Sequence, residues 1–116
     1  MTEPTLVQIL GAGTTRLASG ATTSTSGLFI PDSALTSAGL ATPSAATAEG
    51  HLVALLLAAK SYLTQTNFDA NTDQSILISD GFSSFTTRGT ANYRQDQITV
   101  SLAKVDTSST IDPDNY

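Results

Sequence analysis

The residue types that most often carry out chemistry are scarce in this chain. His51 is its only histidine, and there is no cysteine. A nucleophilic triad would therefore have to be built around His51, yet the chain contains neither a G-x-S-x-G nor an H-E-x-x-H motif. Because His51 follows Gly50 in the first turn of a predicted helix, we expect a partly exposed helix residue. We predict no enzyme activity, no catalytic residue and no cofactor.

Oxygen-bearing side chains recur at alternate positions after the main apolar segment, at Asp69, Asn71 and Asp73, and again at Asp80. Their spacing resembles a calcium-binding loop, in which a tight turn brings several oxygens onto one ion. However, Gln74 stands where such a loop has glycine, and Asp80 stands where it has a bidentate glutamate. The alternative is a turn whose side chains bond to their own backbone. We predict no metal site and keep these four residues as a weak candidate.

Charge excludes one class of partner. The net charge is −5 with a pI near 4.3, and the five basic residues are scattered, whereas nucleic-acid binding needs a basic face. A phosphate-binding G-x-x-x-x-G-K-[ST] motif is also missing. Only 13% of residues are charged, well below the roughly 25% of ordinary globular domains. Such a weakly charged surface, rich in Ser and Thr, indicates a protein that is partly covered in an assembly.

The apolar segments do not predict a membrane partner. The run 52–59 is much shorter than the roughly 20 residues that a membrane-spanning helix requires. The beginning, MTEPTLVQ, has no basic region before an apolar stretch, so it does not read as a signal peptide. We expect a soluble protein that is made in a cytoplasm.

One long apolar segment must position everything else. Residues 49–63 are helix formers, with Leu52, Leu55, Leu56, Ala59 and Leu63 spaced along one helical face. The pattern predicts a main helix over about 47–65 that lies flat on a sheet. We expect Thr47 to cap it, or Pro43 to begin it from an earlier position.

The remaining chain reads as strands and loops. The predicted strands cover 5–10, 28–30, 74–79, 82–88, 91–94 and 97–105, with a helical turn in 32–40 and a turn at Asp80-Gly81. Phe82, Phe85 and Tyr93 are expected to be buried. Ile98, Val100 and Leu102 alternate with polar residues, as in a half-buried antiparallel strand. The fold class is therefore α+β: one main helix on a small antiparallel sheet in a single domain, 1–116. Residues 1–4 and 107–116 are predicted extended arms, and 19–27 is a surface loop or a further arm.

Four segments carry a resemblance to a known group of proteins: LVALLLAAKSYL, NFDANTDQSILISD, YRQDQITVSLAKVD and IDPDNY, which lie in the last two thirds of the chain. They are similar to segments of small structural proteins of tailed bacteriophage virions, in particular those of phages or prophage-like regions of cyanobacteria. Within that group, size and composition most resemble a capsid cement (decoration) protein. The resemblance carries over no functional residue.

The resemblance implies a location and partners. A cement protein sits on the capsid exterior, commonly as a homotrimer over junctions of the major capsid protein, after synthesis in the host cytoplasm. We therefore expect a non-enzymatic virion protein whose partners are the major capsid protein and further copies of itself. Two alternatives stay open. One is a tail, neck or baseplate component, and the other is a small calcium-binding or ligand-binding module.

Overall fold

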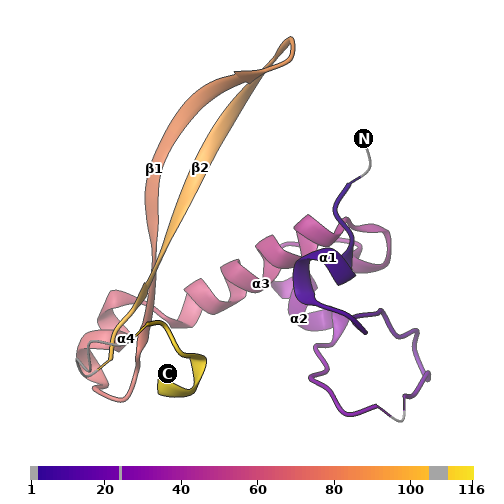
Figure 1. Cartoon of the computed structure of the whole chain (residues 1–116), viewed down its shortest axis with the longest axis horizontal. Coiled ribbons are helices and arrows are strands. Elements are labelled where there is room, and N and C mark those ends of the chain that lie inside the picture. Colours follow the sequence, from indigo (N-terminus) through magenta and orange to yellow (C-terminus); the bar gives the residue numbers. More distant parts are fainter. Residues whose placement is uncertain (1–2, 24, 105–109) are drawn as a thin grey trace. The chain divides into compact units, whose positions relative to one another are not determined.

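The computed structural model describes residues 3–23, 25–104 and 110–116. The chain divides into two compact units, residues 1–58 and 59–116, so the single domain expected from length stays a prediction. Helices and a two-stranded antiparallel sheet make the fold α+β, as predicted, with one long helix (Figure 1). The elements in chain order are α1 (Leu6–Leu10), α2 (Asp32–Ser37), the 3-10 helix η1 (Pro43–Ala45), α3 (Ala48–Tyr62), α4 (Gln65–Ala70), β1 (Ile76–Arg88), β2 (Ala91–Leu102) and the 3-10 helix η2 (Pro113–Asn115).

The first element is a helix, so the predicted strand over 5–10 is wrong. The Thr5 hydroxyl accepts from the Gln8 backbone N–H at 3.2 Å, and the Gln8 side chain accepts from the Thr5 N–H at 2.9 Å. This reciprocal pair satisfies two N–H groups that a helix start otherwise leaves unbonded. The local cap therefore decides the conformation of a segment whose apolar residues alternate.

The second helix follows the predicted helical turn. Leu35 is buried, and Gly39 takes a positive φ of 109° just after the helix, a conformation that glycine adopts at little cost. The predicted strand over 28–30 is not present, because Leu28, Phe29 and Ile30 have no regular structure and are exposed.

The long helix α3 begins as predicted and ends earlier. The Thr47 hydroxyl accepts from the Gly50 N–H at 3.0 Å, which confirms Thr47 as the cap, while Pro43 begins a separate 3-10 helix. The helix ends at Tyr62, and Thr64 caps the short helix α4. The buried residues of α3 are Ala48, His51 and Ala54, whereas the five residues of the predicted apolar face are only half-buried.

The sheet is one long hairpin instead of several short strands. Strand β1 passes through Asp80 and Gly81, where one extra residue of β1 makes a bulge opposite β2. A side chain at Gly81 would come within 3.1 Å of the Gln97 carbonyl oxygen, so only glycine fits there. The predicted turn at Asp80-Gly81 is therefore wrong. The chain reverses at Gly89-Thr90, where Gly89 has a φ of 62°.

The hairpin buries side chains only at its base. Ile98, Val100 and Leu102 lie opposite Asp80, Ile78 and Ile76 on one face, as the alternation predicts, but Val100 and Leu102 are exposed, so their predicted burial is wrong. Of these residues only Ile78 is buried. Phe82 and Phe85 are 86% and 81% exposed, and Tyr93 is also exposed, so the prediction that they are buried is wrong.

The apolar core is small in both units. The buried hydrophobic residues of the described chain are Leu35, Ala48, Ala54 and Ile78. The chain exposes 9039 Å² for a mass of 12.0 kDa. Two separate compact globules of half that mass would together expose about 7,200 Å², so this chain exposes about 1,800 Å² more. The chain therefore has a large exposed surface for its mass, and many of its large hydrophobic side chains are part of that surface.

The predicted arms are partly outside the described residues, which exclude 1–2 and 105–109. Glu3 and Pro4 have no regular structure. The described end of the tail is not extended, because it forms η2 and the Tyr116 ring lies 6.0 Å from the Lys104 ammonium.

Within the described ranges, no helix combines the length and apolarity that crossing a membrane would take.

The position of the core in the first unit can be tested with one charge. Ala54 is 3% exposed on α3, whereas Ala58 on the same helix is exposed. Ala54→Asp places a carboxylate where nothing pairs with it, and we expect a loss of about 3–5 kcal/mol in unfolding free energy. Circular dichroism during thermal melting measures this loss. Ala58→Asp is the control, and an equal loss in both variants would contradict the assigned core.

Candidate functional site

The most connected polar group in the first unit is a three-residue cluster of Arg16, Asp32 and His51, which we call the Arg16 cluster. Arg16 Nη1 lies 2.5 Å from His51 Nε2, and Arg16 Nη2 donates to Asp32 Oδ1 at 2.6 Å. His51 Nδ1 lies 2.7 Å from the Thr47 carbonyl oxygen. The cluster joins the loop after α1 to the first turns of α2 and α3.

The partners of His51 fix its protonation pattern. A carbonyl oxygen only accepts, so Nδ1 carries the proton and donates to Thr47. A guanidinium only donates, so Nε2 accepts from Arg16. Both ring nitrogens are therefore engaged, and neither is placed to take a proton from a nucleophile. The cluster is built to hold three segments together.

The burial of His51 was not expected from the sequence. The ring is 6% exposed, whereas a partly exposed helix residue is predicted, so that prediction is wrong. Arg16 supplies the missing partner from 35 residues away. No local pattern links the two residues, and only the tertiary structure brings the guanidinium over the helix start.

Three of the four weak metal candidates bond to other protein groups through their side chains, and Asp73 takes part only through its backbone N–H. Asp69 accepts from Gln65 Nε2 at 2.8 Å, Asn71 accepts from the Asp73 N–H at 3.0 Å, and Asp80 pairs with Lys60 at 2.5 Å. The Asn71 bond is the side-chain-to-backbone turn that the alternative interpretation predicts. Among the described residues no three His, Asp or Glu side chains form a group that could hold a metal ion.

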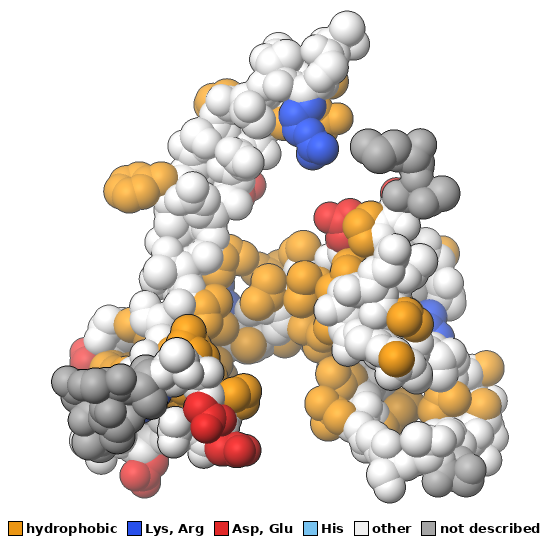
Figure 2. Space-filling view, viewed as in Figure 1, with side chains coloured by type: hydrophobic (Ala, Val, Ile, Leu, Met, Phe, Trp, Pro, Cys, Tyr) orange, Lys and Arg blue, Asp and Glu red, His pale blue; other side chains and the backbone are white. Residues whose placement is uncertain are grey.

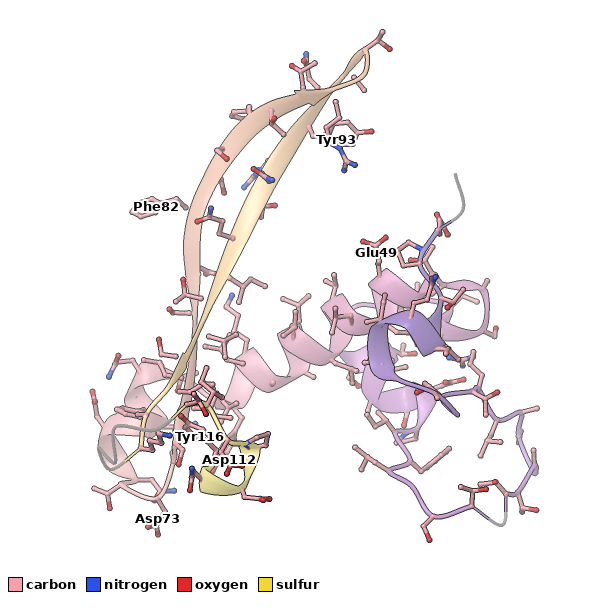
Figure 3. All side chains as sticks on the ribbon, in the orientation of Figure 1. Glu49, Asp73, Phe82, Tyr93, Asp112 and Tyr116 are labelled. Atoms are coloured by element: carbon pink, nitrogen blue, oxygen red, sulfur yellow. The ribbon has the colours of Figure 1, made fainter. Side chains whose placement is uncertain are left out.

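An open cleft lies in the second unit between the loop before β1 and the C-terminal segment. Its volume is about 470 Å³, and Phe68, Asp73, Gln74, Lys104 and Asn115 are among its lining residues. Figure 3 shows Asp73 on the loop at the base of the hairpin. Gln74 Nε2 donates to the Ile76 carbonyl at 2.9 Å, while its Oε1 is buried without a hydrogen bond. These groups do not form a set that recognises one ligand.

The hairpin carries three exposed aromatic side chains, Phe82, Phe85 and Tyr93. Phe82 points away from both strands, and Tyr93 lies near the tip (Figure 3). The Arg88 guanidinium lies 5.7 Å from the centre of the Tyr93 ring. In the space-filling view, separate apolar side chains stand out along the hairpin, with basic side chains near its tip (Figure 2).

One charged network lies midway along the hairpin. Asp96 Oδ1 accepts from the Ser83 hydroxyl at 2.7 Å and from Arg94 Nε at 2.8 Å. The Ser83 hydrogen bond is the main cause that lowers the pKa of Asp96 below its ordinary value of 3.8, and Arg94 adds to it. The charges on this part of the hairpin are thus compensated within the hairpin itself.

Comparison of the chain with known protein families, curated proteins and solved structures finds no match.

The Arg16 cluster makes a prediction for the first unit. Arg16→Met leaves His51 Nε2 without its donor, and we expect the free energy of unfolding to fall by about 1–3 kcal/mol. Thermal melting measures the loss, with Arg88→Met on the exposed hairpin as the control. Imidazole ¹⁵N shifts of the wild type should show the proton on Nδ1. A proton on Nε2 at neutral pH, or an unchanged melt, would contradict the cluster.

The Asp96 network makes a prediction about pH. Because the pKa of Asp96 is lowered by folding, its stabilising contribution is present above 3.8 and is lost as the pH falls through the folded-state pKa. Carboxyl ¹³C shifts between pH 2 and 6 should place the Asp96 midpoint below 3.8. Ser83→Ala should move the midpoint up, and Ser84→Ala, on the neighbouring residue, should not. A wild-type midpoint at or above 3.8 would refute the network.

Proposed function

We propose that this protein is a non-enzymatic structural protein of a tailed-phage virion, and specifically a capsid cement protein that binds over junctions of the major capsid protein. The observation that carries the proposal is the hairpin 76–102, whose largest apolar side chains, Phe82 and Phe85, are exposed. A hairpin alone is marginally stable in water. Such a hairpin would gain stability if another protein covered its exposed aromatic side chains.

Its dimensions suit a contact across a joint. At about 3.3 Å per residue, the 13 residues of β1 extend about 40 Å. A segment of that length can lie across the boundary between two neighbouring shell subunits. Opening the boundary then requires loss of the hairpin contacts, and the stabilisation adds over the many copies bound to one shell.

Composition and resemblance support the same function. The low charge content fits a protein whose surface is largely buried in an assembly, and four segments resemble small virion proteins. The homotrimer and the location on the capsid exterior stay predictions from that resemblance. A tail, neck or baseplate component is the rival within the same class, and particle labelling separates the two.

The test uses the particles made by the phage that encodes the chain. Labelled antibody against the chain should decorate the heads in electron micrographs, and added protein should raise the temperature at which decoration-free heads release their genome. Label on tails alone would select the rival, and no label on any particle would overturn the proposal.

A pair of variants tests the part that the hairpin plays. Phe82→Ser with Phe85→Ser removes two exposed aromatic rings, each worth about 1.5–3 kcal/mol when buried. We expect the affinity for heads to fall at least tenfold. Phe29→Ser with Leu28→Ser, which removes exposed apolar groups outside the hairpin, is the control. An equal loss from the control would contradict docking through the hairpin.

A further inference from the structure

We propose that the outer edge of strand β2 pairs with the same edge of a second copy, so that two hairpins form one four-stranded antiparallel sheet. The inference gives a dimer where the resemblance implies a homotrimer, and it does not rest on a location in a virion.

The two edges of the hairpin differ in how they are protected. The Ile78 N–H of β1 points away from β2 and donates to the Leu63 carbonyl at 2.9 Å. The bulge near Gly81 further interrupts the β1 edge. Both are devices that stop a strand from pairing with another chain. The β1 edge is thus blocked at its base and bent at its middle.

The β2 edge has no such protection. Its 12 residues pair with β1 without an extra residue on the β2 side, and residues 76–102 contain neither proline nor lysine. These are the residues that free edges commonly use to prevent pairing. Among the described residues no backbone hydrogen bond from outside the hairpin reaches β2. An unprotected edge of this length presents unpaired N–H and C=O groups that a strand of another chain can bond.

The backbone geometry identifies the groups that would pair. Because the Ile78 N–H points outward, its antiparallel partner Val100 also turns its N–H and C=O outward. Ile98 and Leu102, two residues to either side, point the same way. These outward groups make a regular row of donors and acceptors along β2.

Charge favours a second copy as the occupant. The hairpin contains Asp80, Asp96, Arg88 and Arg94, so it is neutral within a chain of net charge −5. Asp80 is paired with Lys60, and Asp96 with Arg94. Two copies repel one another through the rest of the chain, but the hairpins can approach without that penalty. A strongly acidic or basic partner would instead favour a hairpin that carries unpaired charges of the opposite sign.

The exposed area is sufficient for such a contact. A standard interface buries about 800 Å² on each partner, and the chain exposes about 1,800 Å² more than two compact globules of its mass would. Pairing β2 with β2 is symmetric, which is the commonest way in which soluble proteins form oligomers. A ring of three hairpins, the form that the resemblance favours, would have to use the blocked edge of β1.

Matched lysine variants test the edge. Gln95→Lys with Thr99→Lys alters β2, and Ser84→Lys with Ser79→Lys alters the residues directly opposite on β1. All four positions are exposed and lie on one face, and both variants change the net charge equally. Sedimentation equilibrium should give a dimer for the wild type and the β1 variant, and at least tenfold weaker association for the β2 variant. Equal effects of the two variants would overturn the proposal, as would a monomeric or trimeric wild type.

Cysteine trapping gives a readout that needs no destabilising change, because the chain has no cysteine of its own. Single cysteines at Gln95, Gln97 and Thr99 should form a disulfide between copies with a yield that peaks at one position, next to the two-fold axis. Single cysteines at Ser79 and Ser84 should not. Equal yields from the two strands would overturn the β2 contact. Head labelling is a separate readout, so failure here leaves the virion assignment to its own test.

Discussion

Scarcity of buried apolar surface is the constraint on which the structure depends. The buried core of the described chain is Leu35, Ala48, Ala54 and Ile78, and the longest regular element after α3 is a hairpin whose aromatic rings are exposed. Hydrophobic burial is the main favourable term in folding, so a chain that buries this little alone gains stability by being covered. The low charge content is consistent with the same need, since a covered surface does not have to keep a protein soluble.

Polar groups compensate locally for the small core. In the first unit one guanidinium contacts His51 and Asp32 and joins three segments that have few apolar contacts. In the second unit Lys60 and Asp80 connect the end of α3 to β1, and the Leu63 carbonyl accepts from Ile78 beside them. These contacts organise the base of the hairpin and leave its distal part free. Edge pairing and shell binding would then use different surfaces, because one needs the backbone edge of β2 and the other the side chains on the faces.

The sequence predicts those elements whose signals are local. The apolar run and Thr47 predict α3, and the alternation of Ile98, Val100 and Leu102 predicts the face of β2. The alternation of Val7 and Ile9 predicts a strand over 5–10, but the bonds between Thr5 and Gln8 favour a helix. Phe82 is predicted to be buried because it is a large apolar side chain in an otherwise polar strand, but the hairpin buries side chains only at its base. The burial of His51 depends on its contact with Arg16, and no local pattern in the sequence identifies Arg16 as its partner. The Asx turn at Asn71 is one of two alternatives that the sequence leaves open, and the structure shows its hydrogen bond from the Asp73 N–H.

We propose that this hairpin is completed by another molecule of the same chain, and amide hydrogen exchange of the wild type measures that pairing most directly. The N–H groups of Ile98 and Val100 point away from β1. We expect them to be protected at high protein concentration and to exchange faster on dilution, while the inward-facing amides of the hairpin keep their protection. Rapid exchange of Ile98 and Val100 at every concentration, in a hairpin whose inward-facing amides remain protected, would contradict the account.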